Sequence, residues 1–356
     1  MPPRFLVQGG RPLAGTVTPA GNKNAALPAI AAALLGDGPV ELSNMPRIVD
    51  VETMLALVAD LGGAVEWTSA HTVRIDGRSV RPKPLDPTLC ARIRASILFA
   101  GPLLARFGEV TLAPPGGDVI GRRRIDTHIL ALEQLGATIE LGERFHLSAP
   151  ALRGAEIFLD EPSVTGTENA LMAAVTRSRL EIEDARPDDL RSTLLGFERL
   201  GVRGRYQGTR LIIDAEQELR VRPDLGNHVP KLEDGPWPAF PADAMSIAVV
   251  TATQCEGMVL LFEKMFESRL FFVDKLIGLG ARIVLCDPHR AVISGPSQLR
   301  GGTVESPDIR AGMAILLAAL AAEGTSTIHN IGQIDRGYER IDERLRALGA
   351  EIQRLD

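Results

Sequence analysis

The sequence contains few aromatic residues and has no excess of positive charge. Phe, Trp and Tyr make up 4% of its 356 residues, so its hydrophobic cores must be built mainly from Ala, Leu, Val and Ile. Lys and Arg number 39 against 45 Asp and Glu, which gives a formal net charge of −6. Proteins that bind DNA or RNA usually carry a basic excess. The charge balance therefore argues against nucleic acid as a partner, although it does not describe any local pocket.

Cysteines and long apolar runs are also scarce. The three cysteines, Cys90, Cys255 and Cys286, are odd in number and far apart. This argues against a disulfide framework or a zinc site and fits a reducing compartment. The opening residues, MPPRFLVQGG, lack the pattern of a signal peptide. Apolar runs such as residues 311–322 are too short to cross a bilayer. These features predict a cytoplasmic protein with no metal and no membrane partner.

A unit of about 72 residues recurs along the chain. In each copy, an amphipathic helix pattern ends in Leu-Gly and is followed by a β-type run. The five copies cover residues 51–67, 125–141, 189–206, 270–285 and 338–355. The glycine after each last Leu should end its helix in the left-handed conformation. These glycines are Gly62, Gly136, Gly201, Gly280 and Gly349.

A second type of helix alternates with the first. Its copies are rich in Ala and apolar on nearly every face, at residues 23–36, 92–108, 167–175, 242–254 and 308–324. A helix that is apolar all round is buried all round. Because strand-like runs follow each copy, the sequence predicts mixed α/β packing in repeated units, with the Ala-rich helices inside and the sheets around them. A doubly wound open sheet is the alternative, but it gives no reason for five such helices.

Charged residues cluster in the loops before helices and at the starts of the buried helices. They are Lys23, Arg94, Asp118, Arg122, Arg123, Arg124, Arg186, Asp243, Arg269, Asp308, Arg310 and Arg336. Equivalent positions in repeats should converge, and helix N-termini together with Arg side chains favour anions. The alternative is a set of solvated surface charges. We favour a polyanion-binding cleft, because Lys23, Arg94 and Asp308 each adjoin an apolar helix, where an unpaired charge is costly.

Several long motifs resemble one family. They include GNKNAALPAIAAALL (21–35), PPGGDVIGRRRIDTHILALEQLGA (114–137), GPWPAFPADAMS (235–246), SPDIRAGMAILLAALAAEGTS (306–326) and IGQIDRGYERIDERLRALGA (331–350). From about residue 4 to residue 354, the chain resembles the UDP-N-acetylglucosamine 1-carboxyvinyltransferases, which are enolpyruvyl transferases. The resemblance implies two inside-out, barrel-like α/β domains, each of three repeated units around buried Ala-rich helices. The two domains would close on phosphoenolpyruvate (PEP) and UDP-N-acetylglucosamine. It also implies no metal or other cofactor, and a monomer or homodimer.

The resemblance assigns roles to individual residues. Lys23, Arg123 and Arg336 would hold PEP, and Asp243 would contact the reacting hydroxyl. Asp118 would give a proton to C3 of PEP, at a position where many members have a cysteine. Lys23, Asp118, Asp243 and Arg336 are thus the expected catalytic residues. The expected substrate-binding residues are Asn24, Arg94, Arg123, Arg124, Ile125, Asp126, Thr127, Ser163, Val164, Met265, Arg269, Asp308 and Arg310. Taken alone, Met265 would more often be a core residue and Ser163 a helix cap.

The chain departs from the family pattern by one repeat, since it has five where the family has six. The join falls near residues 175 and 176, so the expected domains are residues 21–175 and residues 1–20 with 176–356, with a hybrid repeat at the junction. The shorter domain would expose apolar surface that dimerisation could cover. Glu161 stands where the family has a lysine, which predicts weaker nucleotide binding.

The implied function is transfer of the enolpyruvyl group of PEP to the 3-hydroxyl of UDP-N-acetylglucosamine, the first committed step of peptidoglycan synthesis. One alternative is an enolpyruvyl transferase for another acceptor, such as shikimate 3-phosphate. The other is a shortened, inactive paralogue that binds a ligand or a partner.

Overall fold

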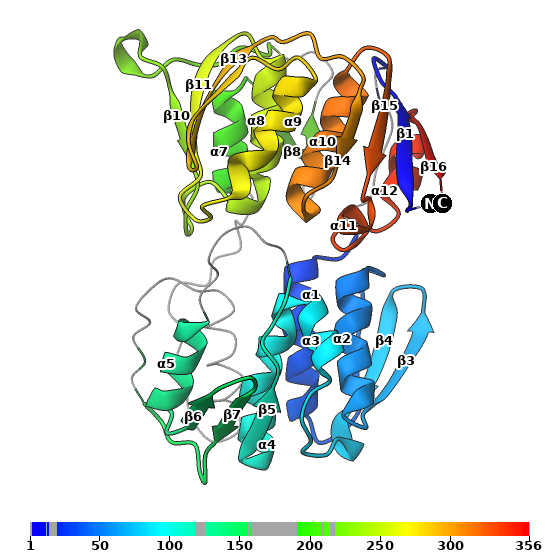
Figure 1. The fold of residues 1–356 in the computed structure, drawn as a ribbon, viewed down its shortest axis with the longest axis vertical. Helices are drawn as coiled ribbons and strands as arrows, with labels where there is room; N and C mark the ends of the chain where they lie inside the picture. Colours follow the sequence, from blue (N-terminus) through cyan, green and yellow to red (C-terminus); the bar gives the residue numbers. More distant parts are fainter. Residues whose placement is uncertain are drawn as a thin grey trace.

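The computed structural model describes residues 2–11, 13, 20–117, 125–155, 157, 191–201, 203–207, 210–213 and 218–355. Within these residues the chain forms two bodies, one above the other in Figure 1, and each has its own hydrophobic core. The lower core is built from buried residues between 26 and 149. The upper core combines Phe5 and Val7 with buried residues between 200 and 352. The expected boundary at residues 175 and 176 lies outside the described residues.

The Ala-rich helices lie in the interior, as predicted. In the lower core they are α1 (Lys23–Ala32), continued by the 3-10 turn η1 (Ala33–Leu35), and the 3-10 segment η3 (Arg94–Phe99), continued by α4 (Ala100–Phe107). In the upper core they are α8 (Ala242–Gln254) and α10 (Ile309–Ala321). Ten of the thirteen residues of α10 are buried. The expected helix at 167–175 lies outside the described residues, so the structure does not test its place.

The helix expected at 92–108 begins differently from the prediction. A short helix, α3 (Pro87–Arg92), ends at the extended residue Ile93, and η3 then leads into α4. Pro102 has no N–H group, so it cannot donate a hydrogen bond to the carbonyl of Leu98. The tighter 3-10 turns before this proline are consistent with that missing bond.

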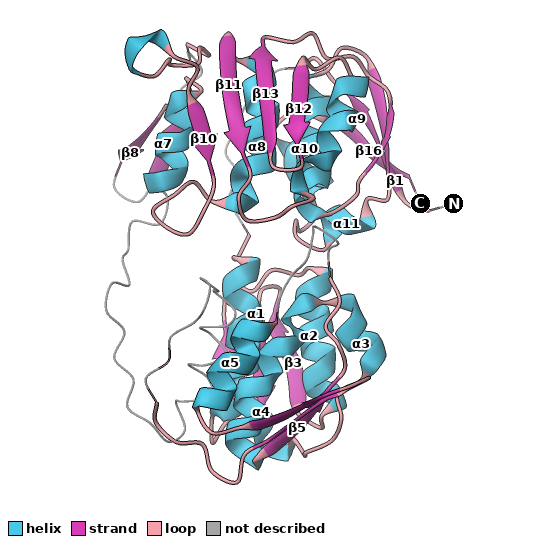
Figure 2. Ribbon diagram, turned by 60° about the vertical axis from the view of Figure 1, so that its left-hand side comes forward, coloured by secondary structure: helices cyan, strands magenta, loops and turns pink. Residues whose placement is uncertain are grey.

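The helices predicted from the amphipathic pattern also form, and they accompany the buried helices in both bodies together with several shorter segments (Figure 2). They are α2 (Val49–Asp60), α5 (Asp126–Gln134), α7 (Arg191–Arg199), α9 (Val273–Gly278) and α12 (Ile341–Ala347). The shorter segments are η2 (Gly77–Ser79), η4 (Leu225–Asn227), η5 (Arg269–Phe272) and α11 (Gly332–Asp335).

The strands form small sheets around the buried helices, and no large parallel sheet occurs in the described part of the chain. The lower body has two three-stranded sheets. The strand order of one is β2 (Val40–Leu42), β4 (Thr72–Asp76), β3 (Ala64–Ser69). The order of the other is β5 (Glu109–Leu112), β7 (Phe145–Ser148), β6 (Thr138–Leu141). In the upper body the first order is β10 (Lys231–Glu233), β11 (Gly257–Phe262), β13 (Arg290–Gly295), β12 (Ile283–Asp287). The second is β14 (Thr303–Glu305), β15 (Thr325–His329), β1 (Arg4–Gln8), β16 (Glu351–Leu355). A two-stranded sheet joins β8 (Gly204–Gln207) and β9 (Arg210–Ile213). The inside-out arrangement is therefore the fold, and the doubly wound sheet is not.

One strand pattern repeats in four of these sheets. The strand after each buried helix pairs antiparallel with a middle strand, which pairs antiparallel with a third, as in β2–β4–β3 and β5–β7–β6. β11–β13–β12 and β15–β1–β16 have the same order, each with an added parallel strand, β10 or β14. In the last sheet the middle strand is β1, so the first strand of the chain completes the final unit.

The five Leu-Gly glycines confirm the predicted helix ends. Their φ angles lie between +89° and +101° at Gly62, Gly136, Gly201, Gly280 and Gly349. Residues with a Cβ rarely adopt this left-handed conformation. One local device therefore ends the amphipathic helix in all five units, including the unit that begins with α7. Within the described residues, no helix is long and apolar enough to span a bilayer.

Candidate functional site

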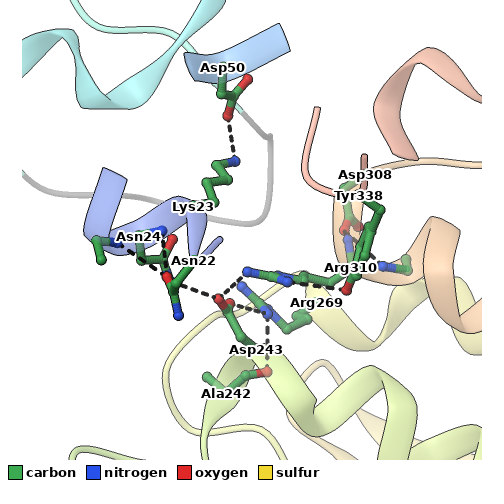
Figure 3. A network of polar contacts seen from close by, with 12 residues as sticks. Asn22, Lys23, Asn24, Asp50, Ala242, Asp243, Arg269, Asp308, Arg310 and Tyr338 are labelled. Carbon is green, nitrogen blue, oxygen red and sulfur yellow. Dashed lines mark hydrogen bonds and ion pairs between the residues drawn. The ribbon is translucent and has the colours of Figure 1, made fainter. Parts of the chain in front are cut away.

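Polar side chains from both bodies meet where the starts of α1, α8 and α10 approach one another (Figure 3). Lys23 and Asn24 are the first two residues of α1, while Asp243 and Arg310 are the second residues of α8 and α10. The repeat places these residues at matching positions of their units. The structure thus brings together charges that lie more than 200 residues apart in the sequence.

Asp243 is the centre of one network. Its Oδ2 accepts hydrogen bonds from Arg310 Nη2 at 2.5 Å and from Asn24 Nδ2 at 3.3 Å. Its Oδ1 accepts one from Arg269 Nη1 at 3.3 Å, and the same nitrogen also donates to the carbonyl of Ala242 at 3.1 Å. The bond from Asn24 crosses between the two bodies. The carboxylate is therefore held by three donors from α1, η5 and α10.

The surroundings of Asp243 keep it ionised. Desolvation raises the pKa of its carboxyl group, but the guanidinium groups of Arg310 and Arg269 and the hydrogen bond from Asn24 outweigh this. The net result is a pKa below its ordinary value. At neutral pH the side chain can accept a proton and has none to give. The Asp243 side chain is 40% exposed, so a small molecule could reach it.

A second network forms around Asp50, at the start of α2. This carboxylate is 2% exposed and pairs with Lys23 Nζ of its own body. Its Oδ1 also accepts a hydrogen bond at 3.1 Å from Arg336 Nε, which belongs to the upper body. Arg336 Nη1 donates to Gln333 Oε1 at 3.0 Å. Two of the cations expected to hold PEP are thus brought together by one buried carboxylate.

Two of the buried helices are capped by side chains at their first turn. Asn22 Oδ1 accepts the backbone N–H groups of Asn24 at 2.8 Å and Ala25 at 3.2 Å at the start of α1. Asp308 Oδ1 does the same at α10, accepting from Arg310 at 2.8 Å and Ala311 at 3.0 Å. Such caps satisfy N–H groups that have no partner within the helix. Asp308 therefore has a structural role in addition to the substrate contact expected of it.

Other expected residues lie elsewhere in the lower body. Arg94 begins η3, and its charge lies close enough to His128 of α5 to act on the imidazole. Ile125 caps α5 without a side-chain hydrogen bond, Asp126 is exposed, and Thr127 is buried. Met265 is 40% exposed in the loop after β11. The expected residues outside the described part of the chain are Asp118, Arg123, Arg124, Ser163 and Val164, together with Arg122, Glu161 and Arg186.

Some residues at the site were not predicted from the sequence. Asp50 is the most prominent, and its signal in the sequence was a carboxylate between Val49 and Val51, at the start of the largely apolar run IVDVETMLALV at 48–58. Tyr338 contributes its hydroxyl group, which lies 3.1 Å from Arg310 Nη1. A further residue that the sequence did not single out, His128, lies near Arg94 in the lower body. It is 1% exposed, and burial together with Arg94 lowers its pKa to about 4, so its imidazole is neutral at pH 7. Among the described residues, no group of three or more His, Cys, Asp or Glu could hold a metal ion.

Comparison with known proteins decides the family. The sequence pattern of the EPSP synthase (3-phosphoshikimate 1-carboxyvinyltransferase) family matches residues 7–225 and 211–345. A UDP-N-acetylglucosamine 1-carboxyvinyltransferase of Bradyrhizobium diazoefficiens is 54% identical, over 99% of this chain and 98% of its own length. One from Treponema denticola is 45% identical, over 98% of each chain. The chain belongs to the UDP-N-acetylglucosamine 1-carboxyvinyltransferase family of enolpyruvyl transferases. It is a transferase.

Solved structures show the same fold. The enolpyruvyl transferase NikO from Streptomyces tendae superposes with a TM-score of 0.83 at 20% identity, covering 99% of each chain. EPSP synthase from Acinetobacter baumannii superposes with a TM-score of 0.64 at 15% identity, covering 99% of this chain and 100% of its own.

The alignment with the Bradyrhizobium relative also bears on the repeat count. It extends over 424 positions, whereas this chain has 356 residues, so at least 68 aligned positions have no residue here. That shortfall is close to one repeat of about 72 residues. The comparison therefore agrees with a family member that is one unit short.

Proposed function

We propose that the chain transfers the enolpyruvyl group of PEP to the 3-hydroxyl of UDP-N-acetylglucosamine, with its chemistry at the meeting point of the two bodies. The observation that carries the proposal is the Asp243 network, in which donors from both bodies hold one ionised carboxylate. Relatives that are 36–54% identical over nearly the whole chain carry the name of this activity. An acceptor such as shikimate 3-phosphate is not favoured, because the named relatives act on the nucleotide sugar.

The reaction adds the sugar hydroxyl to C2 of PEP while C3 gains a proton, and the tetrahedral product then loses phosphate. This chemistry needs a base near the hydroxyl, an acid over C3 and cations around the phosphate. We assign the base to Asp243, because its lowered pKa leaves it ionised and able to accept the hydroxyl proton. Asn24 lies 3.3 Å from the same carboxylate oxygen and would help to orient the acceptor.

We assign the PEP phosphate to Lys23 and Arg336. Both cations are mostly buried, with 16% and 14% of their side chains exposed, and both pair with Asp50. A phosphate dianion would compete with Asp50 for these two cations, since charge-assisted hydrogen bonds are the strong ones. Arg269 and Arg310, which both pair with Asp243, add further positive charge nearby.

Asp118, expected to protonate C3, lies outside the described residues, and its role stays a prediction. The proposal also includes peptidoglycan synthesis as the pathway, with cell shape and division as its consequences. It includes a cytoplasmic location, for which the support is three free, scattered cysteines. The proposal includes a monomer or a homodimer, and the molar mass of the chain in solution would distinguish the two.

Incubation of the purified chain with PEP and UDP-N-acetylglucosamine tests the proposal. Mass spectrometry should show a nucleotide sugar that has gained one enolpyruvyl group, and no such gain should occur with shikimate 3-phosphate. A chain that binds UDP-N-acetylglucosamine but yields no product would favour the shortened, inactive paralogue. The absence of at least 68 family positions makes that outcome the specific rival.

A further inference from the structure

Two buried acids lie next to Arg269, in a place that the sequence did not single out. Glu263 directly follows β11 and is 0% exposed, while Asp234 directly follows β10 and is 1% exposed. β10 and β11 run parallel with Glu233 opposite Phe262, so the chain brings Asp234 and Glu263 to the same edge of the sheet. Arg269 itself is 4% exposed. Three ionisable side chains are therefore enclosed together.

Arg269 lies between the pair of acids and the site. Its Nη1 is 3.3 Å from Asp243 Oδ1, and its Nε is 3.8 Å from Glu263 Oε2, beyond hydrogen-bonding distance. The ring of Phe266 lies 4.4 Å from the guanidinium carbon. Any change in the charge of Glu263 would thus act on the guanidinium group that helps to hold Asp243.

Each of the two acids has one carboxyl oxygen without a hydrogen-bond partner among the described residues, and one proton between them would supply the missing bond. Asp234 Oδ1 accepts the backbone N–H of Lys264 at 2.5 Å, and Glu263 Oε1 accepts that of Phe266 at 3.2 Å. Among the described residues, the other carboxyl oxygens, Asp234 Oδ2 and Glu263 Oε2, have no hydrogen-bond partner. The Asp234 side chain lies close enough to Glu263 to raise the pKa of its carboxyl group. Buried polar atoms are rarely left unpaired, and two ionised carboxylates in contact repel.

The surroundings of Glu263 also favour its protonated form. Burial and the contact with Asp234 raise the pKa of Glu263 to about 9, although Arg269 opposes this. His289 Nδ1 lies 2.7 Å from the backbone oxygen of Glu263, and Lys264 pairs through its Nζ with Glu233. These two side chains thus bind a backbone oxygen and a different carboxylate.

We propose that Asp234 and Glu263 share one proton at neutral pH and act as a positioning pair, fixing Arg269 beside Asp243 without neutralising it. An ionised Glu263 would compete with Asp243 for the same guanidinium group. A protonated Glu263 leaves the charge of Arg269 for Asp243 and for an anionic substrate. The kinetic consequence rests on the proposed function, whereas the shared proton does not.

Infrared spectroscopy of the full chain at pH 7 tests the shared proton directly. A buried protonated carboxyl group gives a C=O stretching band that a carboxylate lacks. We expect this band in the unmodified chain and its loss in Glu263→Gln. The matched control is Glu256→Gln, because Glu256 is an exposed acid one residue before β11 that pairs with Arg220, and it should leave the band unchanged. Absence of the band from the unmodified chain, or its survival in Glu263→Gln, would overturn the inference.

Steady-state kinetics test the positioning role. In Glu263→Gln the amide can donate to Asp234 as the acid does, so kcat should stay within about threefold, whereas Glu263→Ala should lose about tenfold or more. In Asp234→Asn the amide donates a hydrogen bond to Glu263, so Glu263 becomes ionised. Its carboxylate then attracts the guanidinium group of Arg269 away from Asp243. The pKa of Asp243 should then rise, and the acid limb of the kcat profile should move to higher pH.

The kinetic outcomes separate this inference from the proposed function. Equal losses in Glu263→Gln and Glu263→Ala, or an unmoved acid limb in Asp234→Asn, would overturn the positioning role. A chain without transferase activity would contradict the proposed function instead, and the infrared band would still decide the shared proton.

Discussion

The two bodies contribute to the site in different ways, although both are built from the same repeated unit. In the upper body, Asp243, Arg269 and Arg310 already form a network that crosses three elements. In the lower body, the site rests on one buried carboxylate, Asp50, which pairs with Lys23 and with Arg336 of the upper body. The upper network also takes a donor, Asn24, from below. Each body thus contributes one hydrogen-bond donor to the carboxylate network of the other.

The starts of the buried helices show how equivalent positions have diverged. At α1 and α10 a side chain, Asn22 or Asp308, caps the N–H groups of its own helix. At α8 the residue before the helix is Pro241, which makes no side-chain cap. The acid in the first turn of α8, Asp243, is instead bound by residues of three other elements. The residue before the helix therefore caps it in two units, whereas in the third that place is a proline and the acid two residues later belongs to the site.

The largest expected effect is the loss of the upper carboxylate. Asp243→Asn keeps the shape of the side chain but cannot accept the hydroxyl proton, so kcat should fall by about 10²–10⁴. The steady-state rate of phosphate release from PEP measures kcat. Asp287→Asn is the matched control, since Asp287 is a surface acid of the same body that pairs with Arg290. A kcat for Asp243→Asn close to that of the control would remove Asp243 from the chemistry.

The acid expected from the lower body is tested at Asp118. Asp118→Asn cannot deliver a proton and should lose turnover by about 10²–10⁴ while still binding substrate. A carboxylate is a weaker nucleophile than a thiolate, so the unmodified chain should resist epoxide inhibitors such as fosfomycin, and Asp118→Cys should become sensitive. Mass spectrometry after epoxide treatment detects the adduct. An adduct on Asp118 itself, or full turnover in Asp118→Asn, would contradict the assignment.

The shared phosphate site predicts a smaller but symmetrical effect. Lys23→Ala in the lower body and Arg336→Ala in the upper body should each weaken PEP-dependent turnover by about 1.5–3 kcal/mol, because each removes a charge-assisted hydrogen bond. The KM for PEP and kcat/KM measure it. Lys83→Ala, which removes a surface ion pair with Asp60, should change neither. Unchanged kinetics in both site variants would place the phosphate elsewhere.

A pH-dependent change in stability is expected from a buried histidine of the lower body. His128 has a pKa lowered to about 4 by burial and by Arg94, whereas an unfolded histidine has a pKa near 6.5. Between these values the unfolded chain binds more protons, so stability falls as pH decreases from about 6.5 to 4. The histidine should account for about 2 kcal/mol lost by pH 5. Urea unfolding of the unmodified chain and of His128→Gln at pH 7.5 and pH 5 measures it. An equal loss in both proteins would contradict this account.

The smallest effect compares two helix ends in the upper body. Gly280 and Gly349 have similar φ angles, +101° and +99°, but a Cβ at Gly280 would lie 2.9 Å from the carbonyl oxygen of Gln298, while one at Gly349 meets nothing within 4 Å. Gly349→Ala should therefore cost roughly 1–2 kcal/mol of backbone strain. Gly280→Ala should cost more. Thermal unfolding of the two variants ranks them, and the reverse order would show that the clash at Gly280 relaxes.

Much of the fold could be predicted because the repeat makes each signal appear several times. The Leu-Gly ends and the all-apolar helices at 242–254 and 308–324 both depend on local periodicity, which a sequence displays directly. The 3-10 segment at 94–99 was missed, although the missing N–H group of Pro102 is consistent with it. Apolar periodicity does not report such a defect.

The candidate site was predictable in its charges but not in its pairings. Lys23, Asp243, Arg269 and Arg310 were expected to converge, and the structure brings them together with Asn24. Asp50 was missed because its two partners are 27 and 286 residues away. The pairing of Asp234 with Glu263 depends on the parallel register of β10 and β11, which follows from tertiary packing.

Release of inorganic phosphate from PEP, measured with and without UDP-N-acetylglucosamine, tests most directly whether the two bodies together make a working site. The account predicts release that requires the nucleotide sugar, that disappears in Asp243→Asn and that weakens in both Lys23→Ala and Arg336→Ala. No release from the unmodified chain, or release that does not depend on the nucleotide sugar, would contradict it.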